Sequence, residues 1–174
     1  MPVGAPVNRQ VVAENRIFAT VAEEIRDRHG QPYTYHQVEA RSDAVVAVPV
    51  LADGRLLVER IYRHPYKRWF HEFPGGGIDP GEDPVAAAAR ELLEETGHAG
   101  AAPRLLQALE VMPGLLRMRL HVVLIEGCRR VAEPQLEAME LLEVEALTRD
   151  QAWTIARSEP PSSFLVLGLW AWQG

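Results

Sequence analysis

Three glutamates recur at helical spacing between residues 90 and 97, which read Arg-Glu-Leu-Leu-Glu-Glu-Thr-Gly. Offsets of three and four residues place Glu91, Glu94 and Glu95 on one face of a helix. Like charges on one face repel each other, and the carboxyl-terminal end of a helix disfavours anions. Such a face can hold divalent cations, and its hard oxygen ligands predict Mg²⁺, with Mn²⁺ as the alternative. A solvated acidic face is the competing interpretation.

The flanking residues predict where this helix begins and ends. Asp83 followed by Pro84 has the form of an N-cap with proline at the first helical position. Gly97 is typical of a left-handed C-cap. Before the helix, the consecutive glycines 75–77 let the backbone come close to an ion or a phosphate without a Cβ in the way.

Residues 76–98 resemble, almost letter for letter, the signature of the Nudix hydrolases, G-x5-E-x7-R-E-U-x-E-E-x-G-U, in which U is a bulky apolar residue. The specified positions that match are Gly76, Glu82, Arg90, Glu91, Leu92, Glu94, Glu95 and Gly97. His98 departs from the signature, which has an apolar residue there. The resemblance favours a metal site over a solvated acidic face.

The resemblance implies a set of metal ligands. Glu91 and Glu95 would be the principal ligands, Glu94 would support them, and the backbone carbonyl of Gly75 would add an oxygen. Cations held there would bridge the oxygens of a diphosphate and lower the pKa of a bound water. Glu95 is therefore also a catalytic candidate, and its loss should lower turnover by orders of magnitude.

Four residues of the signature are expected to support this site without touching substrate: Gly76, Glu82, Arg90 and Gly97. Arg90 is placed to pair with Glu94 one helical turn further on, which would align the metal ligands. Glu82 is expected to fix the glycine-rich turn rather than to bind metal.

Two segments outside the signature bear on the substrate. Residues 61–65, Ile-Tyr-Arg-His-Pro, resemble the Q-Y-R-x-P stretch of ADP-ribose and nucleotide-sugar pyrophosphatases, with isoleucine in place of glutamine. Arg63 would then clamp the diphosphate through charge-assisted hydrogen bonds. Pro113, 16 positions after Gly97, resembles the mark of the ADP-ribose branch, although a proline that ends a strand is an equal alternative. A carboxylate that the branch has near Met118 is missing.

The segment 127–140 is rich in charge and is expected to form a loop. In the resembling branch this loop carries glutamates that activate water or complete the metal shell. Glu140 falls where a metal-binding and catalytic glutamate is expected, and Glu137 is the candidate for the base. Both could instead be solvated loop charges.

The N-terminal region is expected to form a β-hairpin with its turn at His29–Pro32. Tyr35 and His36 on this hairpin could bind substrate by stacking on a nucleobase, and structural use as strand residues is the alternative. In the resembling enzymes the hairpin is often shared across a homodimer, so we expect a dimer.

Charge, apolar runs and cysteine content narrow the classes of protein and the cellular compartments that fit the sequence. A net charge of −6 argues against nucleic-acid binding. The longest apolar run, 164–172, is far shorter than the roughly 20 residues that span a bilayer, and Met1–Val12 lacks the basic start and apolar stretch of a signal peptide. Cys128, the single cysteine, excludes an internal disulfide. These features predict a cytoplasmic protein.

The elements follow the order strands, helix, strands, helices. The expected strands are 33–39, 44–51, 55–62, 104–111, 118–125 and 141–147, with helices after Asp83, Thr148 and Ser163. This order suits an α/β fold in which a mixed central sheet lies between helices. It is also the Nudix α/β/α sandwich, here as a single domain over 1–174 with an N-terminal hairpin extension over about 1–40.

The resemblance implies a Mg²⁺-dependent pyrophosphatase that cleaves ADP-ribose to AMP and ribose 5-phosphate. Another nucleotide sugar, such as GDP-mannose, is the alternative substrate. A non-catalytic nucleotide-sensing module would lack the metal glutamates, which are all present. Hydrolysis of mutagenic nucleoside triphosphates is disfavoured by the N-terminal hairpin and Pro113. Isopentenyl diphosphate isomerase needs a catalytic cysteine, and Cys128 lies in the wrong place.

Overall fold

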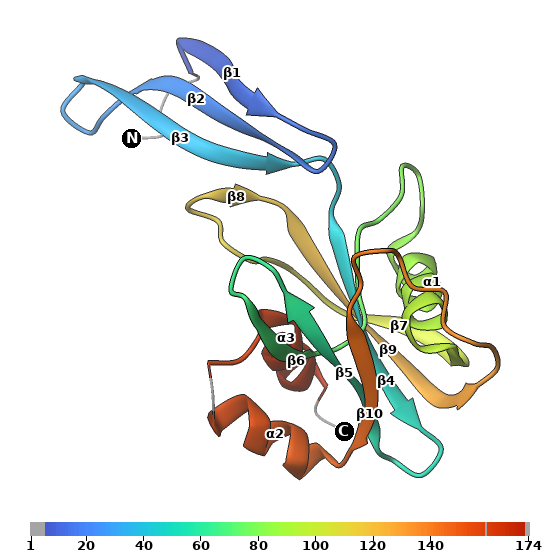
Figure 1. The fold of residues 1–174 in the computed structure, drawn as a ribbon. Helices are drawn as coiled ribbons and strands as arrows, with labels where there is room; N and C mark the ends of the chain where they lie inside the picture. Colours follow the sequence, from blue (N-terminus) through green and yellow to red (C-terminus); the bar gives the residue numbers. More distant parts are fainter. Residues whose placement is uncertain (1–5, 159, 173–174) are drawn as a thin grey trace. The chain divides into compact units, whose positions relative to one another are not determined.

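The computed structural model describes residues 6–158 and 160–172 (Figure 1). The fold has mixed α/β character and divides into two compact units. The N-terminal unit takes the chain up to Asp43 together with Leu109–Arg119, and the signature unit, which contains residues 76–98, takes Ala44–Ala108 and the chain from Leu120 onward. The expectation about a signal peptide concerned Met1–Val12, of which residues 1–5 lie outside the described ranges.

The N-terminal unit is a four-stranded sheet in the order β1-β2-β3-β8. Its strands are β1 (Asn8–Glu14), β2 (Phe18–Arg26), β3 (Pro32–Ala40) and β8 (Leu116–Arg117). The predicted hairpin is confirmed as β2 and β3, whose turn is closed by the Asp27 carboxylate accepting from the backbone N–H groups of His29 and Gln31. β1 was not predicted, because its side chains are all exposed and show no apolar alternation.

The signature unit contains a mixed sheet in the order β10-β5-β4-β9-β7, with β6 paired to β5. Its strands are β4 (Ala44–Leu51), β5 (Leu56–Arg63), β6 (Arg68–Glu72), β7 (His98–Glu110), β9 (Arg119–Arg130) and β10 (Leu142–Leu147). β4 runs parallel to β9 and antiparallel to β5. As its continuous apolar run predicts, β4 is buried along almost its whole length.

The strand boundaries depart from the prediction at three places. β9 continues to Arg130, so the loop expected over 127–140 begins only at residue 131. The strand passes through an irregularity in its pairing with β4, where Gly127 has a φ of 63°, and Cys128 returns to the core beyond it. β7 already begins at His98, and β6 was not predicted as a strand.

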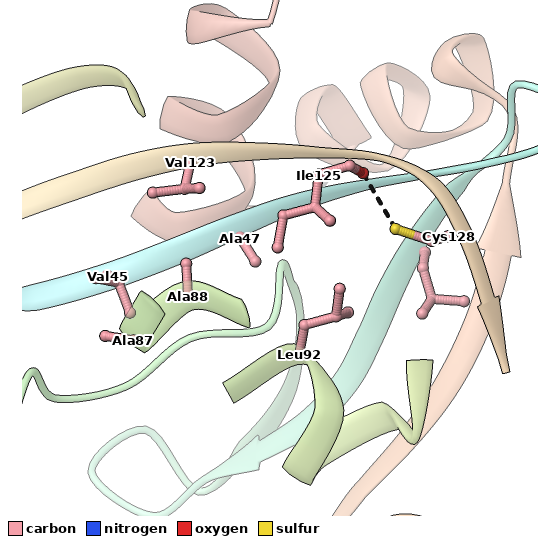
Figure 2. Packing of buried hydrophobic residues seen from close by; sticks show 9 residues of the cluster. Val45, Ala47, Ala87, Ala88, Leu92, Val123, Ile125 and Cys128 are labelled. Carbon is pink, nitrogen blue, oxygen red and sulfur yellow. Dashed lines mark hydrogen bonds between the residues drawn. The ribbon is translucent and has the colours of Figure 1, made fainter. Parts of the chain in front are cut away.

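Helices cover both faces of this sheet, which confirms the α/β/α sandwich. α1 (Pro84–Thr96) packs on the face that carries Val45 and Ala47 of β4, and Figure 2 shows these side chains against Ala88 and Leu92. α3 (Ser163–Ala171) lies on the opposite face, where a Cβ on Gly168 would come within 2.4 Å of the Phe73 ring. α2 (Arg149–Ser158) contacts α3 and β10.

The predicted helix caps are present. The Asp83 side chain accepts from the N–H groups of Val85 and Ala86 at the start of α1. Thr148 and Gln151 exchange the two hydrogen bonds of a capping box before α2. Within the described residues no helix is long and apolar enough to cross a membrane.

Candidate functional site

The glycine turn before α1 lies against both the sheet and the helix. The N–H of Gly75 donates to Oε2 of Glu95 at 2.9 Å, and the carbonyl of Gly76 accepts from the N–H of Val45 on β4. A Cβ on Gly75 would lie 2.3 Å from the Val45 carbonyl oxygen, and one on Gly76 would lie 2.5 Å from Oε1 of Glu91. A Cβ at position 75 would therefore collide with the backbone of β4, whereas one at position 76 would displace the Glu91 side chain, so the turn brings its backbone against the helix carboxylates.

Two of the predicted metal ligands are withdrawn from solvent. Glu95 is 4% exposed, and burial together with the charges of Glu59 and Glu91 raises its pKa to about 10. Burial also raises the pKa of Glu91, although Arg90 opposes this shift. Both shifts mean that the surroundings oppose negative charge on these two carboxylates, and a bound cation would relieve that opposition.

Arg90 contacts several members of the acidic cluster that the glutamates of α1 form with Glu82. Its guanidinium donates to both oxygens of Glu82, to Oε1 of Glu91, to Oε2 of Glu94 and to the carbonyl of Gly77. The predicted pairing with Glu94 is thus present within a larger network. Glu82 also accepts from the N–H of Asp79, and its hydrogen bonds to Arg90 lower its pKa. Glu82 thus links the turn to Arg90, and its expected role as a support that does not bind metal stays a prediction.

Glu140 joins the helix carboxylates from the segment before β10. Its charge is among those that raise the pKa values of Glu59, Glu91 and Glu95. Oε2 of Glu140 accepts from the backbone N–H of Glu137 at 2.6 Å. The charge of Glu140 is therefore within electrostatic reach of the helix glutamates, whereas the observed contact of Glu137 is made by its backbone N–H. The metal-binding and catalytic roles of both residues stay predictions.

Glu59 on β5 belongs to the same cluster and was not predicted. It is 1% exposed, and burial raises its pKa to about 8. A single glutamate in a strand usually marks the solvent face, which is why sequence reasoning passed over it. The available signal was its place in an apolar run, because Glu59 directly follows the buried residues Leu56, Leu57 and Val58.

The predicted diphosphate clamp, Arg63, forms a bidentate pair with Glu72 of β6. Nε and Nη2 of Arg63 donate to the two carboxylate oxygens at 3.1 and 2.6 Å. Glu72 is buried, whereas the Arg63 side chain is 40% exposed. The pair positions the guanidinium in the same part of the unit as Glu59 and Glu95, whose charges act on it. Its contact with a diphosphate stays a prediction.

The other predicted substrate residues lie in the N-terminal unit. The Tyr35 hydroxyl donates to the carbonyl of Gly114 at 2.6 Å, and Tyr35 and Pro113 line a pocket of about 310 Å³. His36 is exposed on β3. The roles of Tyr35, His36 and Pro113 toward a substrate stay predictions.

Residues 40–164 match the family model described as NUDIX domain. The chain belongs to the NUDIX family. It is 31% identical over 151 residues to the CMP-5'-(N-acetyl-N-hydroxy-3-aminopropyl)phosphonate hydrolase of Streptomyces rubellomurinus, covering 86% of this chain and 71% of that protein. It is 25% identical over 153 residues to the ADP-ribose pyrophosphatase of Bacillus subtilis, covering 87% of this chain and 82% of that protein.

A solved structure supports the NUDIX fold. The crystal structure of an ADP compounds hydrolase matches with a TM-score of 0.84 and 23% identity, covering 96% of this chain and 90% of the other. The α/β/α sandwich and the glycine turn before α1 therefore form a NUDIX scaffold.

The end of the NUDIX signature is built around Gly97. Gly97 caps α1 with a φ of 70°, and a Cβ there would lie 2.2 Å from the carbonyl oxygen of Ala132. His98, the departure from the signature, is half-buried with Nδ1 2.8 Å from the carbonyl oxygen of Thr96. A local polar partner accounts for a histidine where the family has an apolar residue.

The residues of this site fit a hard divalent cation. The donors are all oxygens, Glu95 is buried beside the glycine turn, and Oε1 of buried Glu59 has no hydrogen-bond partner. Over residues 6–158 and 160–172, no three His, Cys, Asp or Glu side chains already converge in a metal-binding arrangement. Glu91 accepts a hydrogen bond from Arg90, whereas Glu95 accepts one from the Gly75 N–H. Repulsion between the two negative charges also keeps the carboxylates from converging.

Proposed function

We propose that this NUDIX protein is a Mg²⁺-dependent pyrophosphatase that hydrolyses the diphosphate of ADP-ribose to AMP and ribose 5-phosphate. The observation that carries the proposal is the buried carboxylate of Glu95, bound to the Gly75 N–H beside Glu91 and Glu140. This group of oxygen ligands is suited to Mg²⁺ and, as an alternative, to Mn²⁺.

The proposed roles follow from these contacts. Glu91, Glu95, Glu140 and the Gly75 carbonyl would hold the cation, and Glu94 would support them through Arg90. A bound divalent cation supplies charge stabilisation on the phosphate oxygens and makes water a stronger acid.

Glu140 and Glu137 are the candidates for activating that water. Glu140 is favoured because its carboxylate acts on the helix glutamates, whereas the observed contact of Glu137 is made by its backbone N–H. A base must lie within hydrogen-bond reach of the proton that it removes.

The substrate is inferred from two sources. Relatives named ADP-ribose pyrophosphatase support an ADP-ribose substrate. Arg63, whose side chain is 40% exposed, is proposed to bind the diphosphate, and Tyr35, His36 and Pro113 are proposed to bind the nucleotide. We further propose a cytoplasmic homodimer that binds neither nucleic acid nor membranes.

A second substrate class is favoured by the Streptomyces relative, which is named as a hydrolase of a CMP-linked phosphonate. Hydrolysis of CMP-linked phosphonates by this chain would use the same carboxylates and would also release a nucleoside monophosphate. The two candidates differ in the nucleobase and in the group that leaves with the second phosphorus.

A substrate panel separates these candidates. ADP-ribose, GDP-mannose, a CMP-linked phosphonate and a nucleoside triphosphate would be incubated with Mg²⁺, and the released nucleotides quantified by chromatography. We expect the highest kcat/KM for ADP-ribose. A higher value for the CMP-linked compound would replace the first substrate by the second. The absence of hydrolysis of any compound would contradict the enzymatic proposal and favour a binding module.

A further inference from the structure

Glu59 faces the acidic cluster from the sheet. Successive side chains of a strand point to opposite faces, so Glu59 shares its face with Leu57. Leu57 belongs to the core cluster that contains Ala88 and Leu92 of α1. Glu59 therefore lies on the side of β5 that α1 covers. Its charge acts on Glu95 more strongly than that of any other residue, which places the two carboxylates close together.

One oxygen of the buried Glu59 carboxylate has no hydrogen-bond partner, although the charge of Arg63 acts favourably on the group. The side chain is 1% exposed, and its Oε1 accepts no hydrogen bond. Its cross-strand neighbour on β6 is another glutamate, Glu72, and Arg63 gives both of its hydrogen bonds in this region to Glu72. Leaving a buried carboxylate oxygen without a partner is costly, and like charges directly opposite each other on two strands destabilise the pair.

A cation would satisfy this oxygen. We propose that Glu59 is an additional ligand of the divalent cations, so that the sheet supplies a carboxylate facing those of α1. The inference rests on the cation site in the proposed function, and it extends that site beyond the residues of the NUDIX signature. Glu59 would bind a cation together with Glu95, whose pKa its charge raises, and Glu140, whose charge raises the pKa of Glu59.

A purely structural role makes a different prediction. If Glu59 only fills space beneath the site, replacing it with the isosteric glutamine should leave cation binding unchanged. If it is a ligand, Glu59→Gln removes a charged oxygen donor from the cluster while retaining the shape of the side chain. The metal-free variant should then be at least as stable as the wild type, because glutamine removes a buried group that is costly to ionise.

The test counts bound cations. Mn²⁺ binding to the full chain would be measured by isothermal titration calorimetry and by the electron paramagnetic resonance signal of free Mn²⁺. We expect Glu59→Gln to bind one Mn²⁺ fewer per chain, or to bind Mn²⁺ roughly 10- to 100-fold more weakly. Glu133→Gln is the matched control, because the Glu133 side chain is 86% exposed and forms a surface ion pair with Arg130. It should bind Mn²⁺ as the wild type does.

The outcomes separate this inference from the proposed function. If the wild type binds no Mn²⁺, the cation site itself is wrong. If the wild type binds Mn²⁺, Glu95→Gln weakens binding, and Glu59→Gln binds the same number with the same affinity, only the inference about Glu59 is overturned. Should Glu59→Gln fail to fold, Glu59→Asp retracts the carboxylate by one methylene, and unchanged Mn²⁺ affinity in that variant would also overturn it.

Discussion

Arg63 and Glu72 show how one residue can serve the fold and the substrate together. The carboxylate of Glu72 is buried and depends on the guanidinium, whereas Arg63 keeps 40% of its side chain exposed. A guanidinium fixed in a bidentate pair is oriented in advance and still has N–H groups for a second anion. The proposed contact with a diphosphate is compatible with this pairing.

The two roles can be separated by mutation. Arg63→Ala leaves Glu72 buried without its partner and should lower the free energy of unfolding by about 1–3 kcal/mol, less than for a fully buried pair because Arg63 is partly exposed. Adding Glu72→Gln should recover most of that stability in chemical denaturation. The KM for ADP-ribose should stay raised in the double variant. Recovery of KM together with stability would show that Arg63 acts only on the fold.

At the scale of elements, the glycine turn and α1 together hold the carboxylates of Glu91 and Glu95 in place. The turn supplies an N–H to Glu95 and lies against Glu91, while Gly97 ends the helix where only a residue without a Cβ fits. These features were predictable because each is set by local backbone geometry: an N-cap, a proline, a three-residue glycine run and a left-handed cap.

Two alanine substitutions test the contacts that the glycine turn makes with β4 and with α1. Gly75→Ala places a Cβ 2.3 Å from a backbone oxygen of β4 and should cost about 1–3 kcal/mol of stability. Gly76→Ala meets only the Glu91 side chain, which can move. It should therefore keep a melting temperature near that of the wild type while weakening Mg²⁺ binding roughly tenfold. Thermal melts and Mg²⁺ titrations of activity would check both, and equal stability losses in the two variants would contradict the geometry.

The elements that were missed depend on contacts across the chain. β9 extends past Gly127 because a pairing irregularity lets Cys128 re-enter the core, and a charged stretch around a glycine does not reveal this from composition. Glu59 was missed because its burial comes from packing under α1. Glu140 was predicted because the resemblance gave its spacing, whereas the proximity of its carboxylate to Glu91 and Glu95 required the fold.

At the scale of the whole molecule, the signature predicted the family, and residues outside it carry the substrate assignment. The NUDIX match over 40–164 includes parts of both compact units. The single-domain organisation and the homodimer stay predictions, because they depend on how units and chains associate rather than on a local pattern.

The acidic cluster should also couple stability to pH and to metal. Glu59 and Glu95 have pKa values raised from 4.5 to about 8 and about 10, so the folded state holds protons that the unfolded state releases. Their contribution to stability is fully present below pH 4.5 and declines as pH rises toward the folded pKa values. Mg²⁺ replaces these protons when it binds. The rise in the protein's melting temperature on adding Mg²⁺ should therefore be larger at about pH 8 than at about pH 6, at equal ionic strength.

Melting curves with and without Mg²⁺ at the two pH values check this coupling. Glu95→Gln is the comparison, and it should show a smaller effect of Mg²⁺ at both. An equal effect of Mg²⁺ on the wild type at the two pH values would contradict a cation site built from protonated carboxylates.

The most direct measurement of the central claim is the rate of AMP release from ADP-ribose with saturating Mg²⁺ in the wild type, Glu95→Gln and Glu133→Gln. Circular dichroism would first show that all three are folded. The account predicts that Glu95→Gln loses at least about 100-fold in kcat, because a buried charged ligand is removed, while Glu133→Gln turns over at the wild-type rate. Turnover by Glu95→Gln at the wild-type rate would contradict the assignment of the carboxylate cluster as the catalytic cation site.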